Sequence, residues 1–442
     1  MVDDSETILQ HTVASPGAAT SRRVEKGIIG AVRHLSRDIG TRTAGSKGER
    51  RAARFVEREL EALGFSVETQ RFHAPSTVAW SEMLSHLILV AGVILFPAQA
   101  VLSYLLVLLG FVLFLLEGFG RSPLAWASPR LQSENVIAKI HPAREPETRL
   151  VIIAHLDSPR SAFYCHPSAV RLLRSFYLLD TACQCALFML FTVAFGGQLL
   201  SMERSRLDLL WHVGLALAVP PFLAMLAIFA KAASGRDTPG GNHNASGVAV
   251  LLEIARIYSR RHLHKAELWL AFTGASEVAA YGVRKLVRRH RKQLRDAYFI
   301  VLEGVGRGFP ACCSREGRLI PFRANRRLLN LAKRTSQSYI HHGTGLVGNA
   351  LYLGEGFQLL SRGHKAITLC SRDETPFPRY WRWVKDDHLN VDPRSLRMSL
   401  DFLRAMVDAI DHGALAKRGR GARRRPARQP PLSAGSAPRE GQ

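Results

Sequence analysis

The stretch that decides the fold is residues 150–157, which read Leu-Val-Ile-Ile-Ala-His-Leu-Asp. Its apolar first part is typical of a short strand buried in the middle of a sheet. Outward from it, further strands are predicted at residues 267–272, 298–302 and 366–370, and helices at residues 247–258 and 278–289. Alternating strands and helices indicate an α/β fold, a mostly parallel mixed sheet with helices on both faces.

Polar side chains follow the ends of these predicted strands, and one opens the helix near residue 247. In chain order they are His155, Asp157, His243, Ser276, Glu277 and Glu303. A single residue of this kind is more often a helix cap or a hydrogen-bonded surface group. Sites in parallel α/β sheets form at the carboxyl ends of strands, however, so we expect this set to converge. Imidazole and carboxylate groups together suit zinc.

Two pairs of apolar segments interrupt the α/β pattern. Residues 83–119 are nearly uncharged and are broken mainly at Pro97. They correspond to roughly 55 Å of helix, enough for about two crossings of a ~30 Å hydrocarbon core. Residues 176–200 and 207–230 form a second such pair. We therefore predict two transmembrane hairpins, since buried helices of a soluble protein rarely contain apolar stretches of this length.

The hairpins lie inside the α/β domain rather than before it. The predicted segments are a disordered leader (1–20), the first part of the domain (21–80), hairpin 1 (81–120), the second part of the domain (121–170), hairpin 2 (171–231), the remainder of the domain (232–412) and a basic disordered tail (413–442). Each hairpin returns the chain to the side that it left. The domain and both termini are therefore expected on one side of the membrane.

The chain is strongly basic, with 60 Lys+Arg against 36 Asp+Glu and a net charge of +24. Such a charge favours nucleic acid, anionic membrane surfaces or acidic partners. The side that holds the domain carries nearly all of the basic residues, so the positive-inside rule places the domain and both termini in the cytoplasm. The polar N-terminus, which has no apolar signal segment, agrees with this prediction.

The expected partners follow from the same features. No nucleic-acid motif accompanies the charge, so nucleic acid is not expected. The membrane is the main predicted partner, and Arg423–Arg425 of the tail can bind anionic lipid, although a solvated tail is an equal alternative. Four membrane helices also suit a transporter. The apolar segments hold few polar groups, however, with Glu117 and Asp180 near predicted helix ends, where interfacial residues are expected.

Several segments together resemble the zinc exopeptidases of metallopeptidase family 28, which includes leucyl aminopeptidases and aminopeptidase Y and has glutaminyl cyclases as relatives. They are Gly40–Ser46 with Gly64-Phe65, Ala154–Ser158, Asn244–Glu253, Phe272–Glu277 and Tyr380–Pro393. The resemblance covers about residues 25–80, 135–165 and 235–410. The combination is specific, whereas no single motif is, and the apolar hairpins look like insertions.

The resemblance implies a fold of the zinc aminopeptidase type and a site that binds a peptide or peptide-like ligand. In the family, an Asp bridges two zinc ions, and a Glu just before a ligand Glu is the general base. His155 matches the first ligand, Asp157 the carboxylate that orients it, and Glu277 the ligand Glu. Glu303 stands where the family usually has Asp.

Three positions depart from the family pattern. The bridging Asp is His243, the general base is Ser276, and the last ligand His falls on Arg382. His388 can replace that ligand only if the loop shifts. A neutral imidazole does not bridge two zinc ions, a Ser hydroxyl is not a base near pH 7, and the Arg382 charge repels a second zinc. One zinc ion is therefore compatible with the site, and two are disfavoured.

These departures favour a membrane protein whose peptidase-like domain is catalytically reduced or silent, a pseudoenzyme that acts in binding or scaffolding. The alternative is an active single-zinc metallohydrolase, an aminopeptidase or amide hydrolase. His155, His243 and Glu303 would then be the ligands, and Glu277 the base or a fourth ligand. A conventional two-zinc aminopeptidase is least favoured. If Arg382 pairs with Glu277, a salt bridge fills the place of the second zinc.

Overall fold

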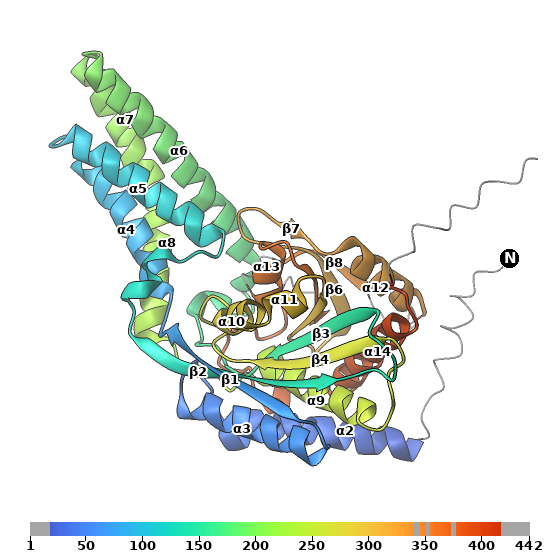
Figure 1. The fold of residues 1–442 in the computed structure, drawn as a ribbon. Coiled ribbons are helices and arrows are strands. Elements are labelled where there is room, and N and C mark those ends of the chain that lie inside the picture. Colours follow the sequence, from blue (N-terminus) through green and yellow to red (C-terminus); the bar gives the residue numbers. More distant parts are fainter. Residues whose placement is uncertain (1–17, 339–344, 351–353, 373–376, 417–442) are drawn as a thin grey trace, which may run out of the picture.

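The computed structural model describes residues 18–338, 345–350, 354–372 and 377–416. Within these ranges, nine strands form one sheet in the order β1-β2-β4-β3-β5-β9-β6-β7, with β8 paired to β6 (Figure 1). The strands are β1 Val67–Pro75, β2 Arg130–Ile140, β3 Thr148–His155, β4 Ala266–Thr273, β5 Tyr298–Glu303, β6 Phe309–Glu316, β7 Phe322–Arg323, β8 Gly345–Ala350 and β9 Lys365–Arg372.

The central strands β4, β3, β5 and β9 are parallel, as the sequence predicts. The outer strands differ: β1 and β2 join one edge antiparallel, β6 and β7 join the other antiparallel, and β8 runs parallel to β6. The α/β fold with a mixed sheet is present, but its parallel part is confined to the centre. Strand β1 alternates between buried and exposed residues, which an antiparallel edge tolerates and a buried parallel strand does not.

Helices cover both faces of the sheet because side chains alternate along each strand. In β3, Leu150 and Ile152 face one core, whereas Val151 and Ile153 face the other. The first core is covered by α2 Ala18–Arg33, α3 Lys47–Ala62, α9 Ser246–Tyr258, α12 Arg326–Ser338 and α14 Pro393–Asp411, and the second by α10 Tyr281–Arg289, α11 Arg291–Leu294 and α13 Glu355–Leu360. The short turns are η1 His34–Ile39, η2 Pro123–Ala127, η3 Phe163–Cys165, η4 Val170–Leu172, η5 Gly241–Ala245 and η7 His388–Asn390.

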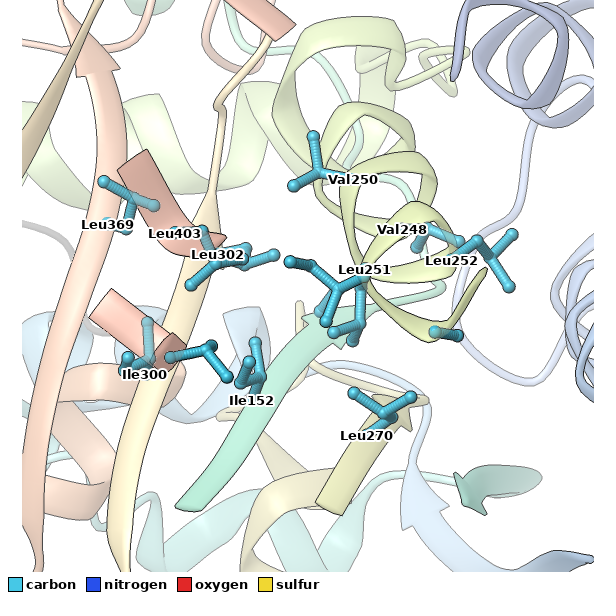
Figure 2. Packing of buried hydrophobic residues seen from close by; sticks show 14 of the residues in the cluster. Ile152, Val248, Val250, Leu251, Leu252, Leu270, Ile300, Leu302, Leu369 and Leu403 are labelled. Carbon is cyan, nitrogen blue, oxygen red and sulfur yellow. The ribbon is translucent and has the colours of Figure 1, made fainter. Parts of the chain in front are cut away.

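Helix α9 packs on the centre of the sheet and is buried over nearly its whole length. Figure 2 shows its Leu251 directed toward Ile152 and Leu302 of the sheet. Gly247 permits the close approach, because a Cβ atom there would lie 3.3 Å from the Cβ atom of Leu302. The start of α9 is therefore held firmly against the carboxyl ends of the strands, and it carries the η5 loop with it.

Apolar helices form a bundle that projects away from the sheet (Figure 1). They are α4 Ala79–Leu95, α5 Ala100–Gly118, α6 Leu173–Leu199, α7 Arg204–Leu217 and α8 Val219–Ser234. Among the described residues, three segments are long and apolar enough to cross a membrane, residues 100–118, 170–199 and 204–234, and α4 is a shorter apolar helix. Large apolar side chains of the bundle, such as Leu105, Met189 and Leu209, are exposed. These features suit contact with hydrocarbon.

The last apolar segment is divided rather than continuous. The sequence predicts one helix over residues 207–230, but α7 ends at Leu217 and α8 begins at Val219. Pro220 and Pro221 follow at once. Proline has no N–H group to donate to the preceding turn, so the helix is interrupted where these two residues enter it.

The bundle buries more polar side chains than the sequence predicts. Asp180, expected at an interface near a helix end, is only 4% exposed. The Nε2 atom of Gln184 donates to its carboxylate at 3.1 Å, and Nε2 of His86 lies 3.5 Å from it. Glu117 is also buried and accepts a hydrogen bond from Ser122. These groups are tolerated because neighbouring helices supply hydrogen-bond partners.

Most of the predicted disordered leader and tail lies outside the described residues. Helix α2 begins at Ala18, so residues 1–17 of the predicted leader lie outside the described residues. The predicted tail lies outside them beyond residue 416, including Arg423–Arg425.

Candidate metal site

Three predicted site residues come together at the carboxyl edge of the sheet. His155 ends β3, Glu303 ends β5, and His243 lies in the η5 loop before α9. Their donor atoms all lie within 4.8 Å of one another, and all three residues are buried. In the part of the chain that the structure describes, this is the only such group of His, Cys, Asp and Glu side chains. Their spacing is that of side chains gathered around one point.

The ring of His155 is oriented by a hydrogen bond on the side away from the cluster. Its Nδ1 atom donates to the main-chain oxygen of Asp157 at 2.9 Å, and its Nε2 atom lies 3.8 Å from Oε2 of Glu303. A proton on Nδ1 leaves the lone pair of Nε2 free on the side of the cluster. Burial lowers the pKa of His155, but Asp157 and Glu303 outweigh burial and raise this pKa to about 10. The surroundings therefore attract positive charge.

The ring of His243 is held in the complementary way. Its Nε2 atom donates to Oε1 of Glu277 at 2.8 Å, while its Nδ1 atom lies 3.3 Å from Oε1 of Glu303. Nδ1 is buried and has no hydrogen-bond partner among the described residues. An unpartnered nitrogen, a second imidazole nitrogen and a carboxylate around one point fit a zinc ion, whose ligand rings usually donate their other N–H to an oxygen.

Glu277 lies beside this cluster and is held by two groups. Arg382 donates to its Oε2 atom at 2.6 Å, and His243 donates to its Oε1 atom. Burial raises the pKa of Glu277, but Arg382 and His243 outweigh burial and hold this pKa well below its usual range. Glu277 therefore stays a carboxylate that contacts the outer nitrogen of His243, and its salt bridge with Arg382 fills the adjoining space.

Asp157 and Ser276 meet through the backbone. The two carboxylate oxygens of Asp157 accept the main-chain N–H groups of Ser276 at 2.9 Å and Glu277 at 2.8 Å. Asp157 thus fixes the loop that carries Glu277, and it contacts His155 chiefly through its main-chain oxygen. The remaining predicted candidate, His388, lies in η7 and is not a member of the cluster.

Two positioning residues were not predicted. Asp386 accepts the main-chain N–H groups of Asn242 at 2.6 Å and His243 at 3.2 Å, so it shapes the η5 loop. Burial raises the pKa of Asp386 to about 6, although His243 and these N–H groups lower it. Arg42 is fully buried, and its guanidinium donates to the main-chain oxygen of Leu156. Both residues lie in segments that resemble metallopeptidase family 28. An Arg or an Asp at these positions does not by itself predict a positioning role, however.

The loops around Glu277 and Arg382 have strained backbones. Ala275, Ala279, Ala280, Tyr380 and Arg382 have φ values between 49° and 60°, in the left-handed region that favours glycine. Helix α10 consequently begins at Tyr281 and not at residue 278, as the sequence predicts. Strain of this kind persists only where the surrounding structure fixes the loop, and here it fixes the Glu277–Arg382 pair.

Part of the chain that contains this site matches a known protein family. Residues 227–407 match the sequence model of Peptidase family M28. These residues form an M28-like region of this chain. The matched range includes His243, Glu277, Glu303 and Arg382, and it begins after the strand that ends in His155. No curated protein sequence matches the chain.

Solved structures of M28-like fold overlap nearly the whole chain. An aminopeptidase from Aneurinibacillus sp. strain AM-1 is 15% identical, with 88% of this chain and 94% of that chain covered and a TM-score of 0.52. BSAP, a zinc aminopeptidase from Bacillus subtilis, is 12% identical, with 87% and 95% covered and a TM-score of 0.51. A Bacteroides thetaiotaomicron glutaminyl cyclase bound to N-acetylhistamine is 15% identical, with 87% and 97% covered and a TM-score of 0.50. At these identities the likeness shows the fold alone.

Proposed function

We propose that this chain is a membrane-anchored amide hydrolase that works with one zinc ion. The observation that carries the proposal is the unpartnered Nδ1 atom of His243, which is buried and lies 3.3 Å from Glu303. His155 directs its Nε2 atom to the same carboxylate. Two imidazole nitrogens and one carboxylate are a ligand set that leaves zinc an open position.

Each residue has a distinct part in this proposal. His155, His243 and Glu303 would hold the ion, and Asp157 and Glu277 accept the outer ring protons that set the two tautomers. When bound there, zinc supplies Lewis-acid chemistry for the hydrolysis of an amide. Arg382 neutralises Glu277, so neither a second zinc ion nor a Glu277 base forms part of the proposal.

In this proposal the chain is an integral membrane protein with four membrane spans. Its insertions, residues 81–120 and 171–231, would anchor a cytoplasmic domain and two cytoplasmic termini. The apolar bundle supports the membrane anchor, and the basic charge of the rest of the chain supports the orientation. The ligand would be a peptide or peptide-like amide, with anionic lipid as a partner of the tail and no nucleic acid.

A silent binding protein is the second candidate. It is favoured by the Glu277–Arg382 pair, because this pair leaves the cluster without a free carboxylate base. In that case the M28 domain would bind a ligand or partner without hydrolysing it.

Metal analysis paired with amidase assays tests both candidates. The full chain is purified in nanodiscs, and its zinc content and its hydrolysis of aminoacyl and N-acyl amides are measured. His155→Ala removes a proposed ligand, and His388→Ala is the matched control outside the cluster. We expect about one zinc per chain and an activity that His155→Ala abolishes. Zinc without activity would establish the silent candidate, and two zinc ions or none would overturn the single-zinc site.

A further inference from the structure

One cavity joins the candidate metal site to the apolar bundle. It has a volume of about 990 Å³, and Glu277, Glu303 and Arg382 line one end of it. Its other walls come from α4, α5, α6 and α8, with Phe176 and Ala227 among the lining side chains. A ligand that reaches the metal site through this cavity therefore passes between apolar helices.

The apolar end of the cavity reaches the outer surface of the bundle. Leu172, Leu223 and Leu226 line the cavity and are also exposed. In the proposed membrane arrangement, these side chains touch hydrocarbon. A hydrophobic chain dissolved in the bilayer enters such an opening without crossing water. A polar peptide would lose hydration against these three leucine side chains, which have no polar atoms to replace its hydrogen bonds with water.

The cavity also holds a cation that forms no salt bridge within the described residues. Lys231 of α8 lines the cavity and forms no ion pair with any described residue. By contrast, Arg318 in the same wall pairs with Glu82 at 2.9 Å. The charges of Arg382 and Glu277 act on Lys231, as does that of Glu82 on α4, so Lys231 lies between the metal site and the bundle helices that line the cavity. An anionic group on the ligand would complete this charge arrangement.

The cation and the apolar opening of the cavity lie at different heights along α8. Lys231 and Leu223 lie eight residues apart in one helix, which corresponds to roughly 12 Å along its axis. The cavity therefore offers a cation beside the metal site and an apolar wall leading away from it. Its shape and charge suit a molecule with one anionic end and one hydrocarbon chain.

We infer that the substrate is an N-acyl amino acid taken from the membrane. Its fatty acyl chain lies along α6 and α8, its carboxylate pairs with Lys231, and its amide reaches His155, His243 and Glu303. This inference rests on the proposed function, since it names the substrate class of that same site. Hydrolysis consumes one water: the amide C–N bond breaks, a C–O bond forms on the fatty acid, and the released amine takes a proton.

Binding and hydrolysis are measured separately, with N-dodecanoylglycine, N-acetylglycine and uncharged N-dodecanoylglycinamide as probes. Binding is measured by calorimetry on the His155→Ala chain in nanodiscs, with binding to empty nanodiscs subtracted. We expect N-dodecanoylglycine to bind at least about tenfold more tightly than each of the other two probes. Hydrolysis by the zinc-loaded wild type should follow the same order.

Two matched substitutions, one in α8 and one in α7, separate the effect of the cavity from that of the rest of the bundle. Ala227→Trp fills the apolar part of the cavity, and Ala216→Trp makes the same change on the exposed side of α7. We expect about tenfold weaker binding of N-dodecanoylglycine for Ala227→Trp and no change for Ala216→Trp. Lys231→Gln should remove the preference for the carboxylate, and Lys231→Arg should restore it. These two charge variants keep the test decisive if Ala227→Trp does not fold.

The outcomes distinguish this inference from the proposed function. Chain-length-dependent binding without hydrolysis of any amide would support the ligand class and overturn the hydrolase. Hydrolysis of short, soluble amides with no gain from the dodecanoyl chain would support the hydrolase and overturn the membrane substrate. Equal binding of all three probes, or equal loss in the Ala216→Trp and Ala227→Trp chains, would also overturn it.

Discussion

At the scale of single residues, the site depends on which nitrogen of each imidazole ring is left free. His243 replaces the carboxylate that bridges two zinc ions in the resembled family, yet Glu277 turns its Nδ1 atom toward Glu303. Arg382 in turn forms a salt bridge with Glu277. Two of the three departures from the family pattern are thus coupled, because His243 donates to Glu277 and Arg382 keeps Glu277 ionised.

Reversing these departures should restore a second metal site. The triple variant His243→Asp, Ser276→Glu and Arg382→His supplies a bridging carboxylate, a base and a last ligand, and it removes the fixed charge. We expect about two zinc ions per chain by elemental analysis, against one in the wild type. Arg382→Ala is the control, because it removes the charge without adding a ligand and should leave one zinc ion. A triple variant that still holds one ion would show that the loop geometry, not these side chains, limits the site.

The residues that sequence reasoning found are those fixed by the ends of strands. His155 and Glu303 end buried strands, so their convergence follows from the parallel register of β3 and β5. Asp386 and Arg42 escaped prediction because they act through hydrogen bonds to main-chain groups of loops distant in sequence. The burial of Asp180 was not predicted, because its partner His86 lies on another helix and one-dimensional periodicity cannot show that contact.

At the scale of elements, the central strands are predictable and the edges are not. Strands β3, β4, β5 and β9 are apolar runs because both faces are buried. Strand β6 is apolar over residues 309–313 but contains Pro310, and its last three residues are polar, whereas β8 is glycine-rich, so neither gives a clear pattern. The start of α10 was also misplaced, because a left-handed turn at Ala279 and Ala280 is invisible in residues that favour helices.

That turn predicts an unusual stabilising substitution. Ala279 has a φ value of 52°, where a side chain costs energy and glycine does not. Ala279→Gly should therefore raise the free energy of unfolding by about 1 kcal/mol. Ala405→Gly, inside α14, is the control and should lower it by about 1 kcal/mol. Thermal unfolding of both variants checks the signs, and a lower midpoint for Ala279→Gly would contradict the strain.

Strand β6 carries a buried carboxyl group that predicts a pH-dependent stability. Burial against α13 and β9 raises the pKa of Glu316 to about 7 from an ordinary value of 4.5. The folded protein therefore holds this proton more tightly than the unfolded chain. Its contribution to stability is fully present below the unfolded pKa and is lost as the pH rises through the folded pKa near 7. The full loss corresponds to about 3 kcal/mol.

The variant Glu316→Gln isolates this effect. It keeps the shape of the side chain and removes its charge, so it should unfold close to the wild type at pH 5 and at a higher temperature at pH 8. Glu61→Gln, in an exposed position of α3, is the control and should shift the midpoint little at either pH. An equal shift at both pH values for Glu316→Gln would mean that packing, not ionisation, is responsible.

At the scale of the whole molecule, the apolar helices and the α/β domain meet at one cavity. Insertions that merely anchored the domain would have no reason to line its site. Here α4, α5, α6 and α8 share a cavity with Glu277, Glu303 and Arg382. The sequence predicts both the apolar segments and the polar residues at the strand ends. It does not predict that they line one cavity, because this depends on how the helix bundle packs against the α/β domain.

The orientation of the bundle gives the last prediction. Most basic residues lie outside the apolar helices, so the positive-inside rule favours the proposed orientation, with the domain in the cytoplasm and the tips of both hairpins on the opposite side. Gln99→Cys and Glu203→Cys place thiols at these tips, and His141→Cys places one on an exposed position of the domain. A membrane-impermeant maleimide should label the two tips in intact cells and His141→Cys only after permeabilisation, with the unsubstituted chain as the background control. Labelling of His141→Cys in intact cells would reverse the orientation, and the N-acyl amino acid would then reach the site from the outer leaflet.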